Sequence, residues 1–180
     1  MSTTNPMPVA ATQEERWTPY RHAQPKESPP ELVVPNVIPT DERVWVPVDD
    51  NVWFRPLFFD MNSGSHGEVL KVKKGGVLSR HRHPSPVHGF VLKGSWRYLE
   101  HTWRATEGSY VMEPPGETHT LTCDSGDEMQ TMFIIQGATL YIDEQDKVTL
   151  VEDNFQLIEA CRKHYEAVGL GADFVNQFIR

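Results

Sequence analysis

Three histidines in the middle of the chain have the residue type and the spacing of metal ligands. His81 and His83 are two positions apart, and in an extended strand this spacing places both imidazoles on one face. His119 follows the turn-forming Pro-Pro-Gly of residues 114–116, at the start of another apolar run. Imidazole suits zinc, copper, iron and nickel alike, so these residues predict a metal site without choosing the metal.

The strands expected to hold these histidines belong to an all-β segment. From residue 41 to residue 152, short runs rich in Val, Trp, Phe and Tyr are separated by Gly, Pro, Asp or Ser, which is typical of strands in a barrel or a two-sheet sandwich. Residues 1–40 contain eight of the 14 prolines and are predicted to form an extended arm. Residues 153–180 have helical apolar spacing, with Asp153 or Asn154 as a cap and Gly169 as a stop.

Composition narrows the classes of partner. The 180 residues suit one domain, and 17 basic against 25 acidic side chains give a net charge of -8, which disfavours nucleic acid and anionic membranes as partners. Two cysteines cannot build a disulfide framework, and no run approaches the roughly 18 apolar residues of a membrane span. We expect a soluble, cytoplasmic protein with a small ligand. The apolar residues 31–39 favour packing of the arm along a sheet edge or a neighbouring subunit.

The histidine segments resemble the two motifs of the cupin superfamily, whose fold is a double-stranded β-helix or jelly-roll barrel. The first motif is matched by Gly75, His81, His83 and Gly94, and the second by Gly108, Pro114, Gly116 and His119. This sequence differs from the cupin pattern at the position where most cupins carry a glutamate ligand, because the residue at that position is Val87. The neighbouring His88 is expected to face outward, since a shift by one residue turns a strand side chain to the opposite face; a bulge is the alternative that would bring it to the metal.

A site of three imidazoles without a carboxylate predicts a particular ligand chemistry. The metal would keep its full +2 charge and one open side, which favours an anionic, bidentate oxygen ligand such as an enediolate together with dioxygen. His22, His66 and His101 have no partner pattern and are expected at the surface, and Cys161 and His164 are expected to be structural.

Beyond the motifs, nearly everything after about residue 37 resembles the 2,4'-dihydroxyacetophenone dioxygenases. The segments that carry the likeness include ERVWVPV, VLSRHRHPSPVHGFVLKGSWRYLEH, YVMEPPGETHTL and HYEAVGLGADFVNQFIR. The resemblance implies a homodimer or homotetramer with Fe(2+) held by His81, His83 and His119. It also implies cleavage of a small aromatic α-hydroxyketone with O2, between the carbonyl and hydroxymethyl carbons, to give 4-hydroxybenzoate and formate.

Several other residues are candidates for catalysis or substrate contact. A general base is expected from Glu113, which lies six residues before His119 and is favoured by resemblance, or from Glu100; the alternative is that either carboxylate is only solvated. Trp96, Tyr98, Val87 and Cys123 are expected to line the substrate cavity. Trp96 and Tyr98 share a strand face, and if that face points outward they are core or interface residues instead.

Two other classes of function stay open at this point. One is a non-catalytic metal-binding cupin, similar to the zinc-binding cupin domains of bacterial anti-sigma factors. The residues ahead of the barrel are too few and too proline-rich for the helical domain that such proteins carry, and the glutamate ligand is missing. The other is an isomerase or a sugar-binding cupin, because one fold hosts many reactions.

Overall fold

The structure is a computed structural model that describes residues 12–180. The described residues divide into two compact units, one ending at Val33 and one comprising Val34–Arg180. In the first unit, the short helix α1 (Gln13–Trp17) stands in a stretch free of proline, whereas the sequence predicted no helix there. The predicted arm before residue 12 lies outside the described residues.

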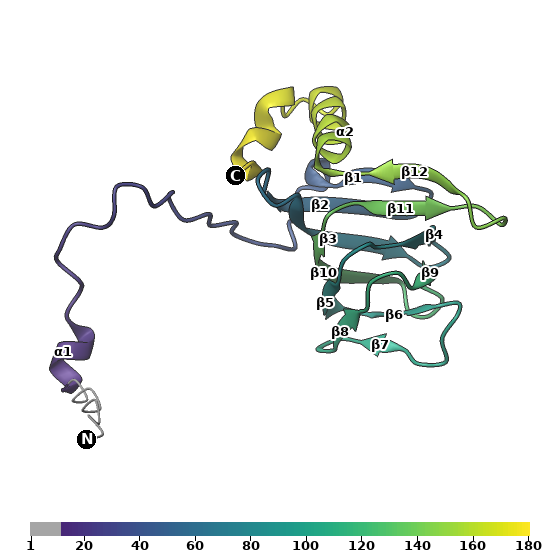
Figure 1. Cartoon of the computed structure of the whole chain (residues 1–180), viewed down its shortest axis with the longest axis horizontal. Helices are drawn as coiled ribbons and strands as arrows, with labels where there is room; N and C mark the ends of the chain where they lie inside the picture. Colours follow the sequence, from purple (N-terminus) through teal and green to yellow (C-terminus); the bar gives the residue numbers. More distant parts are fainter. Residues whose placement is uncertain (1–11) are drawn as a thin grey trace, which may run out of the picture. The chain divides into compact units, whose positions relative to one another are not determined.

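The second unit contains two antiparallel sheets that face each other (Figure 1). In order across the first sheet, the strands are β1 (Val46–Asp49), β2 (Val52–Phe59), β3 (Ser65–Lys73), β10 (Glu128–Gln136), β5 (Val87–Lys93) and β8 (Tyr110–Glu113). Across the second, they are β12 (Val148–Glu152), β11 (Thr139–Ile142), β4 (Val77–Arg82), β9 (Thr118–Thr122), β6 (Ser95–Tyr98) and β7 (Ala105–Thr106). The predicted all-β barrel is confirmed.

The turns between these strands have the residues that their geometry requires. Gly94 joins β5 to β6 with a φ of 71°, and a Cβ at this position would collide with the carbonyl oxygen of Glu128. A hairpin joins β11 to β12, where the backbone amide of Asp143 donates to the carbonyl oxygen of Lys147 over 3.0 Å. The strands β11 and β6 that flank these turns pair with the histidine strands β4 and β9.

Helices close one end of the second unit. A short 3-10 helix, η1 (Glu42–Val44), precedes β1, and α2 (Asn154–Ala167) begins at Asp153, whose carboxylate accepts hydrogen bonds from the backbone amides of Phe155 and Gln156. The helix buries Leu157, Ile158, Cys161 and Tyr165. Phe155 has the helical apolar spacing of these residues but is 71% exposed, in the first turn of the helix.

The chain ends on the barrel. Within the predicted helical segment, the 3-10 helix η2 (Ala172–Phe178) follows α2, and the residues after it pair with β2 through a bridge between Phe59 and Ile179. His164 contributes to the packing of α2, because its Nε2 lies 2.9 Å from the carbonyl oxygen of Arg43. Among the described residues, no helix has the length and apolarity that crossing a membrane requires.

Candidate metal centre

Two neighbouring strands of the second sheet bring the predicted ligands together. His81 on β4 and His119 on β9 are directly paired in register, and His83 follows β4 by one residue on the same face. The backbone amide of Gly116 donates a 2.8 Å hydrogen bond to the carbonyl oxygen of His83, so the Pro-Pro-Gly turn is tied to the end of the histidine strand. One nitrogen of each of the three imidazoles lies within 4.8 Å of the others, and all three side chains are buried.

The three imidazoles are neutral and their nitrogens are available. Burial lowers the pKa of His83 to about 2 and that of His119 to about 3, and it lowers the pKa of His81 as well. Nδ1 of His81 donates to the carbonyl oxygen of Ser79 over 2.7 Å, which leaves Nε2 with its lone pair free. Neutral imidazole with a fixed tautomer is the form that binds a metal ion.

Glu113 extends the histidine cluster at the end of β8. Its Oε2 lies 3.7 Å from Nε2 of His83 and 3.5 Å from Nε2 of His119, and these imidazoles are neutral, so the contacts are not ion pairs. Oε1 accepts a hydrogen bond from the hydroxyl of Tyr98, whose ring stacks on His119 with 3.9 Å between centroids. Burial raises the pKa of Glu113 to about 7, although the bond from Tyr98 acts in the opposite direction.

These atoms fit a bound metal ion. Both ring nitrogens of His119, Nδ1 of His83 and Oε2 of Glu113 are buried without a hydrogen-bond partner. Buried polar atoms are rarely left unpaired, and one nitrogen from each imidazole lies close to the other two, so this donor set fits a cation. Among the described residues, only the three histidines form a group whose ligand atoms all lie within 4.8 Å, and Glu113 is adjacent to that group without belonging to it.

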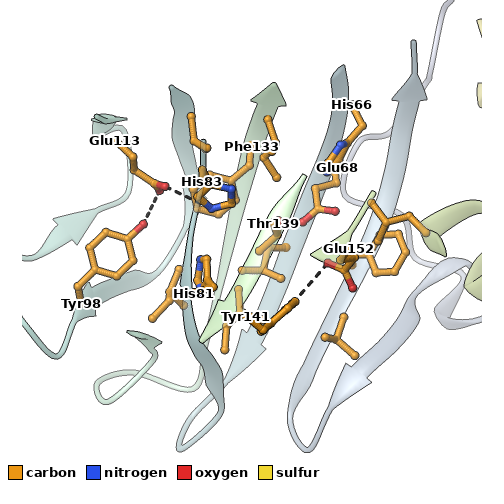
Figure 2. Close-up of a pocket in the computed structure, with 18 residues that line it drawn as sticks. His66, Glu68, His81, His83, Tyr98, Glu113, Phe133, Thr139, Tyr141 and Glu152 are labelled. Atoms are coloured by element: carbon orange, nitrogen blue, oxygen red, sulfur yellow. Dashed lines mark hydrogen bonds and ion pairs between the residues drawn. The ribbon is translucent and has the colours of Figure 1, made fainter. Parts of the chain in front are cut away.

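A cavity between the two sheets opens onto His81 and His83. Together with the open space at its mouth it measures about 540 Å³, and its walls also include Val87, Tyr98 and Glu113 (Figure 2). Val87 pairs in register with Glu113, so the residue in the usual glutamate position contributes an apolar wall beside the carboxyl group. Apolar walls with a few polar side chains are typical of a site for a small organic ligand.

Three other sequence candidates lie away from the cavity. Trp96 and Cys123 are fully buried in the core. The strand face that carries Trp96 and Tyr98 points inward, but only Tyr98 reaches the cavity wall. Glu100 does not continue this alternation, because β6 ends at Tyr98. Its carboxylate instead accepts 2.8 and 2.9 Å hydrogen bonds from the backbone amide and hydroxyl of Thr120.

The remaining histidines divide between surface and interior. His88 faces away from the cavity, as favoured, and its Nδ1 lies 2.8 Å from the hydroxyl of Tyr110. His22 is exposed, and His101 contacts Glu117 with 2.7 Å between Nε2 and Oε1. The prediction that His66 lies at the surface was wrong, because its side chain is 2% exposed and lines the cavity. Position 66 shares a strand face with Leu70 and Val72, which are buried.

The sequence reasoning missed a group of polar residues across the cavity from Glu113. Glu68 on β3, Tyr141 on β11 and Glu152 on β12 all line the wall (Figure 2). A signal for Glu68 was present, because this residue alternates with Leu70 and Val72 on a face that an apolar strand would bury. No such signal marks Glu152, which pairing of β12 with β11 brings to the cavity.

Comparison with known proteins gives a family and a fold. The profile of the ChrR cupin-like domain matches residues 34–140. An RmlC-like cupin protein from Ralstonia eutropha JMP134 is 30% identical, with a TM-score of 0.64, over 69% of this chain and 83% of that one. An acetylacetone dioxygenase from Acinetobacter johnsonii is 18% identical, with a TM-score of 0.67, over 81% and 99%. No curated protein sequence matches the chain.

Proposed function

This chain belongs to the ChrR cupin-like family of the cupin superfamily, and on that premise we propose that it is an iron-dependent dioxygenase. The proposed reaction cleaves 2,4'-dihydroxyacetophenone between its carbonyl and hydroxymethyl carbons. The ketone carbon gains one oxygen atom and becomes the carboxyl carbon of 4-hydroxybenzoate. The hydroxymethyl carbon gains the other and becomes formate, so one O2 is consumed and no further reductant is needed.

The proposed metal site is the set of His81, His83 and His119. Ferrous iron bound there would supply Lewis acidity towards the two oxygens of the α-hydroxyketone and electrons for dioxygen. The three imidazoles contribute no negative charge, so the site favours a substrate that binds as an anion. His81 is fixed by its bond to Ser79, and His119 by its stacking on Tyr98.

Glu113 is the proposed general base. The α-hydroxyketone must lose a proton to bind as an anion, and the Oε2 atom of Glu113 has no partner of its own and lies beside two ligand nitrogens. A pKa of about 7 suits a group that accepts and returns a proton near neutral pH. Burial also raises the pKa of Tyr98 well above its ordinary value, so its hydroxyl stays a donor that positions the carboxyl group.

The observation that carries this proposal is that imidazole nitrogens without hydrogen-bond partners lie beside the carboxyl group of Glu113 at one cavity. A structural metal site would have its ligands closed around the ion, whereas a catalytic site keeps space for substrate. The dioxygenase from Acinetobacter shows that the same fold accommodates such chemistry, although at 18% identity the likeness extends to the fold alone.

The test is anaerobic reconstitution with ferrous iron, followed by 2,4'-dihydroxyacetophenone and ¹⁸O-labelled dioxygen. We expect equal amounts of 4-hydroxybenzoate and formate, with one labelled oxygen atom in each. Absence of formate, or equal formate from a His119→Ala variant, would contradict the proposal. The predicted homodimer or homotetramer stays a prediction that light scattering of the purified protein tests.

A second candidate is a non-catalytic zinc-binding regulatory cupin, which the ChrR-type family match favours. In that case the histidines would hold zinc, and Glu113 would complete or support the site rather than exchange protons. Elemental analysis of freshly purified protein separates the two candidates. Stoichiometric zinc without iron-dependent formate release would identify the regulatory protein.

A further inference from the structure

The cavity continues past the histidines to a second polar cluster. We call Glu68 and Glu152, together with the hydroxyl of Tyr141, the acidic pole. Figure 2 shows the acidic pole on one side of His81 and His83, with Glu113 and Tyr98 on the other. Tyr141 spans the two regions, because it pairs in register with His81 and its hydroxyl lies 3.4 Å from Oε2 of Glu152.

The groups of this cluster have few protein partners. Glu68 is 9% exposed, and its carboxyl group accepts no hydrogen bond from the described residues. A buried carboxyl group is normally paired, so Glu68 points to a polar ligand.

Neither a second metal ion nor an internal counter-ion fits the geometry of the acidic pole. A second metal ion would need three converging ligand atoms, and of the described residues only His81, His83 and His119 provide them. An internal counter-ion is also missing, since none of the described lysines and arginines lines the cavity. A polar group that enters with an organic ligand fits this geometry instead.

The protonation state of the acidic pole favours a neutral hydroxyl over a cation as the ligand group that binds there. Burial raises the pKa of Glu68 to about 8, with the charge of Glu152 adding to the effect, and burial raises the pKa of Glu152 as well. The pair therefore retains a proton near neutral pH, and such a pair can both accept a hydrogen bond from a hydroxyl and donate one to it. The nearby wall is apolar, with Phe133 paired in register to Glu68 (Figure 2).

We propose that the acidic pole binds a ring hydroxyl of the aromatic ketone whose other end lies at the histidines. The inference rests on the proposed function and deepens it by assigning the residues that recognise the ring hydroxyl remote from the ketone. Phe133 and the other apolar walls contact the ring, and Glu68 and Glu152 exchange hydrogen bonds with its hydroxyl. Glu68 is thus a specificity-determining residue.

The binding test uses metal-free protein, so that it does not depend on turnover. Calorimetry compares 4'-hydroxyacetophenone with acetophenone, neither of which carries the α-hydroxyl. We expect the wild-type protein to bind the hydroxylated ligand about tenfold more tightly or better, as a hydrogen bond to a buried carboxyl group implies. Glu68→Leu and Glu152→Leu should each remove most of this preference, and Glu68→Gln, which keeps the shape, should reduce it.

Glu107→Gln is the matched control, because Glu107 is exposed and outside the cavity; it should keep the full preference. Equal affinity of the wild-type protein for both ligands, failure to bind either, or a preference that survives in all three pole variants would overturn the inference.

Turnover separates this inference from the proposed function. Iron-loaded protein is given 2,4'-dihydroxyacetophenone or 2-hydroxyacetophenone, and kcat/KM is measured from formate. A lower value for the substrate without the ring hydroxyl, with the difference lost in Glu68→Leu, supports the inference. Formate from both substrates at equal kcat/KM refutes the acidic pole but keeps the dioxygenase. No formate from either, with the binding preference intact in metal-free protein, refutes the dioxygenase and keeps the acidic pole.

Discussion

Each end of the cavity carries a buried carboxyl group, but the hydrogen-bond partners of the two carboxyl groups differ. At the histidine end, Glu113 is held by Tyr98 and faces two imidazole nitrogens. At the acidic pole, Glu68 has no hydrogen-bond partner among the described residues, and Glu152 has only a long contact with Tyr141. A positioned carboxyl beside a metal site suits proton transfer, whereas an unsatisfied one suits recognition. Under the proposed function, this difference in partners favours proton transfer at the histidine end and substrate selection at the acidic pole.

The sharpest way to break this comparison is to remove a ligand at the histidine end. His119→Ala should lower iron affinity by more than about 100-fold, since loss of a ligand costs more than loss of an outer-shell partner, and formate release should cease. His88→Ala, in which the lost imidazole contacts only Tyr110 outside the cavity, is the control and should retain iron. Stoichiometric iron in purified His119→Ala, measured by elemental analysis, would contradict the assignment.

Glu113→Gln tests whether the carboxyl group at the histidine end takes part in proton transfer. Gln keeps the size of the side chain but cannot accept a proton, so kcat should fall by about 100-fold or more while iron binding persists. The comparison is Glu100→Gln, in which the altered carboxyl bonds Thr120 outside the cavity and should have a much smaller effect. Similar kcat values for the two variants, measured by oxygen consumption with iron-loaded protein, would remove Glu113 from the mechanism.

The pair His81 and His83 was predictable from the sequence because two-residue spacing fixes one strand face. His119 was added to this pair by the resemblance to the second cupin motif, since the pairing of β4 with β9 that brings it to His81 is not local. Glu100 shows the limit of this reasoning, because alternation holds only while the strand continues, and β6 ends two residues earlier. The strands themselves were predicted well, since runs of apolar and β-branched residues are strong signals.

The acidic pole was not predictable because it is assembled by non-local pairing. Alternation indicates that Glu68 shares a face with buried residues, but the sequence does not state that β11 and β12 bring Tyr141 and Glu152 opposite to it. A lone Glu on such a strand is compatible with a surface position until the facing sheet is known. His66 was misassigned for the same reason, because its burial depends on packing across the barrel.

The pH dependence of stability tests the buried, unpaired state of Glu68. A carboxyl whose pKa rises to about 8 on folding binds a proton in the folded protein that the unfolded chain releases above about pH 4.5. The free energy of unfolding should therefore fall between pH 5 and 8, relative to Glu68→Gln, by roughly 3 kcal/mol. Urea denaturation at the two pH values measures the difference, and Glu107→Gln should give none. A constant difference for Glu68→Gln would mean that Glu68 is ionised or paired in the folded protein.

Tyr98→Phe has the smallest expected effect and separates positioning from metal binding. The variant keeps the ring that stacks on His119, so iron should stay bound, but Oε1 of Glu113 loses its donor. Because that bond lowers the pKa of Glu113, its loss should raise the pKa, and the rise of kcat with pH should move to higher pH. At neutral pH we expect kcat to fall by about tenfold, as the loss of one hydrogen bond to a charged group implies. Tyr110→Phe, which removes a hydroxyl outside the cavity, should leave the pH profile in place; an unmoved profile in Tyr98→Phe as well would mean that Tyr98 only packs and does not position the base.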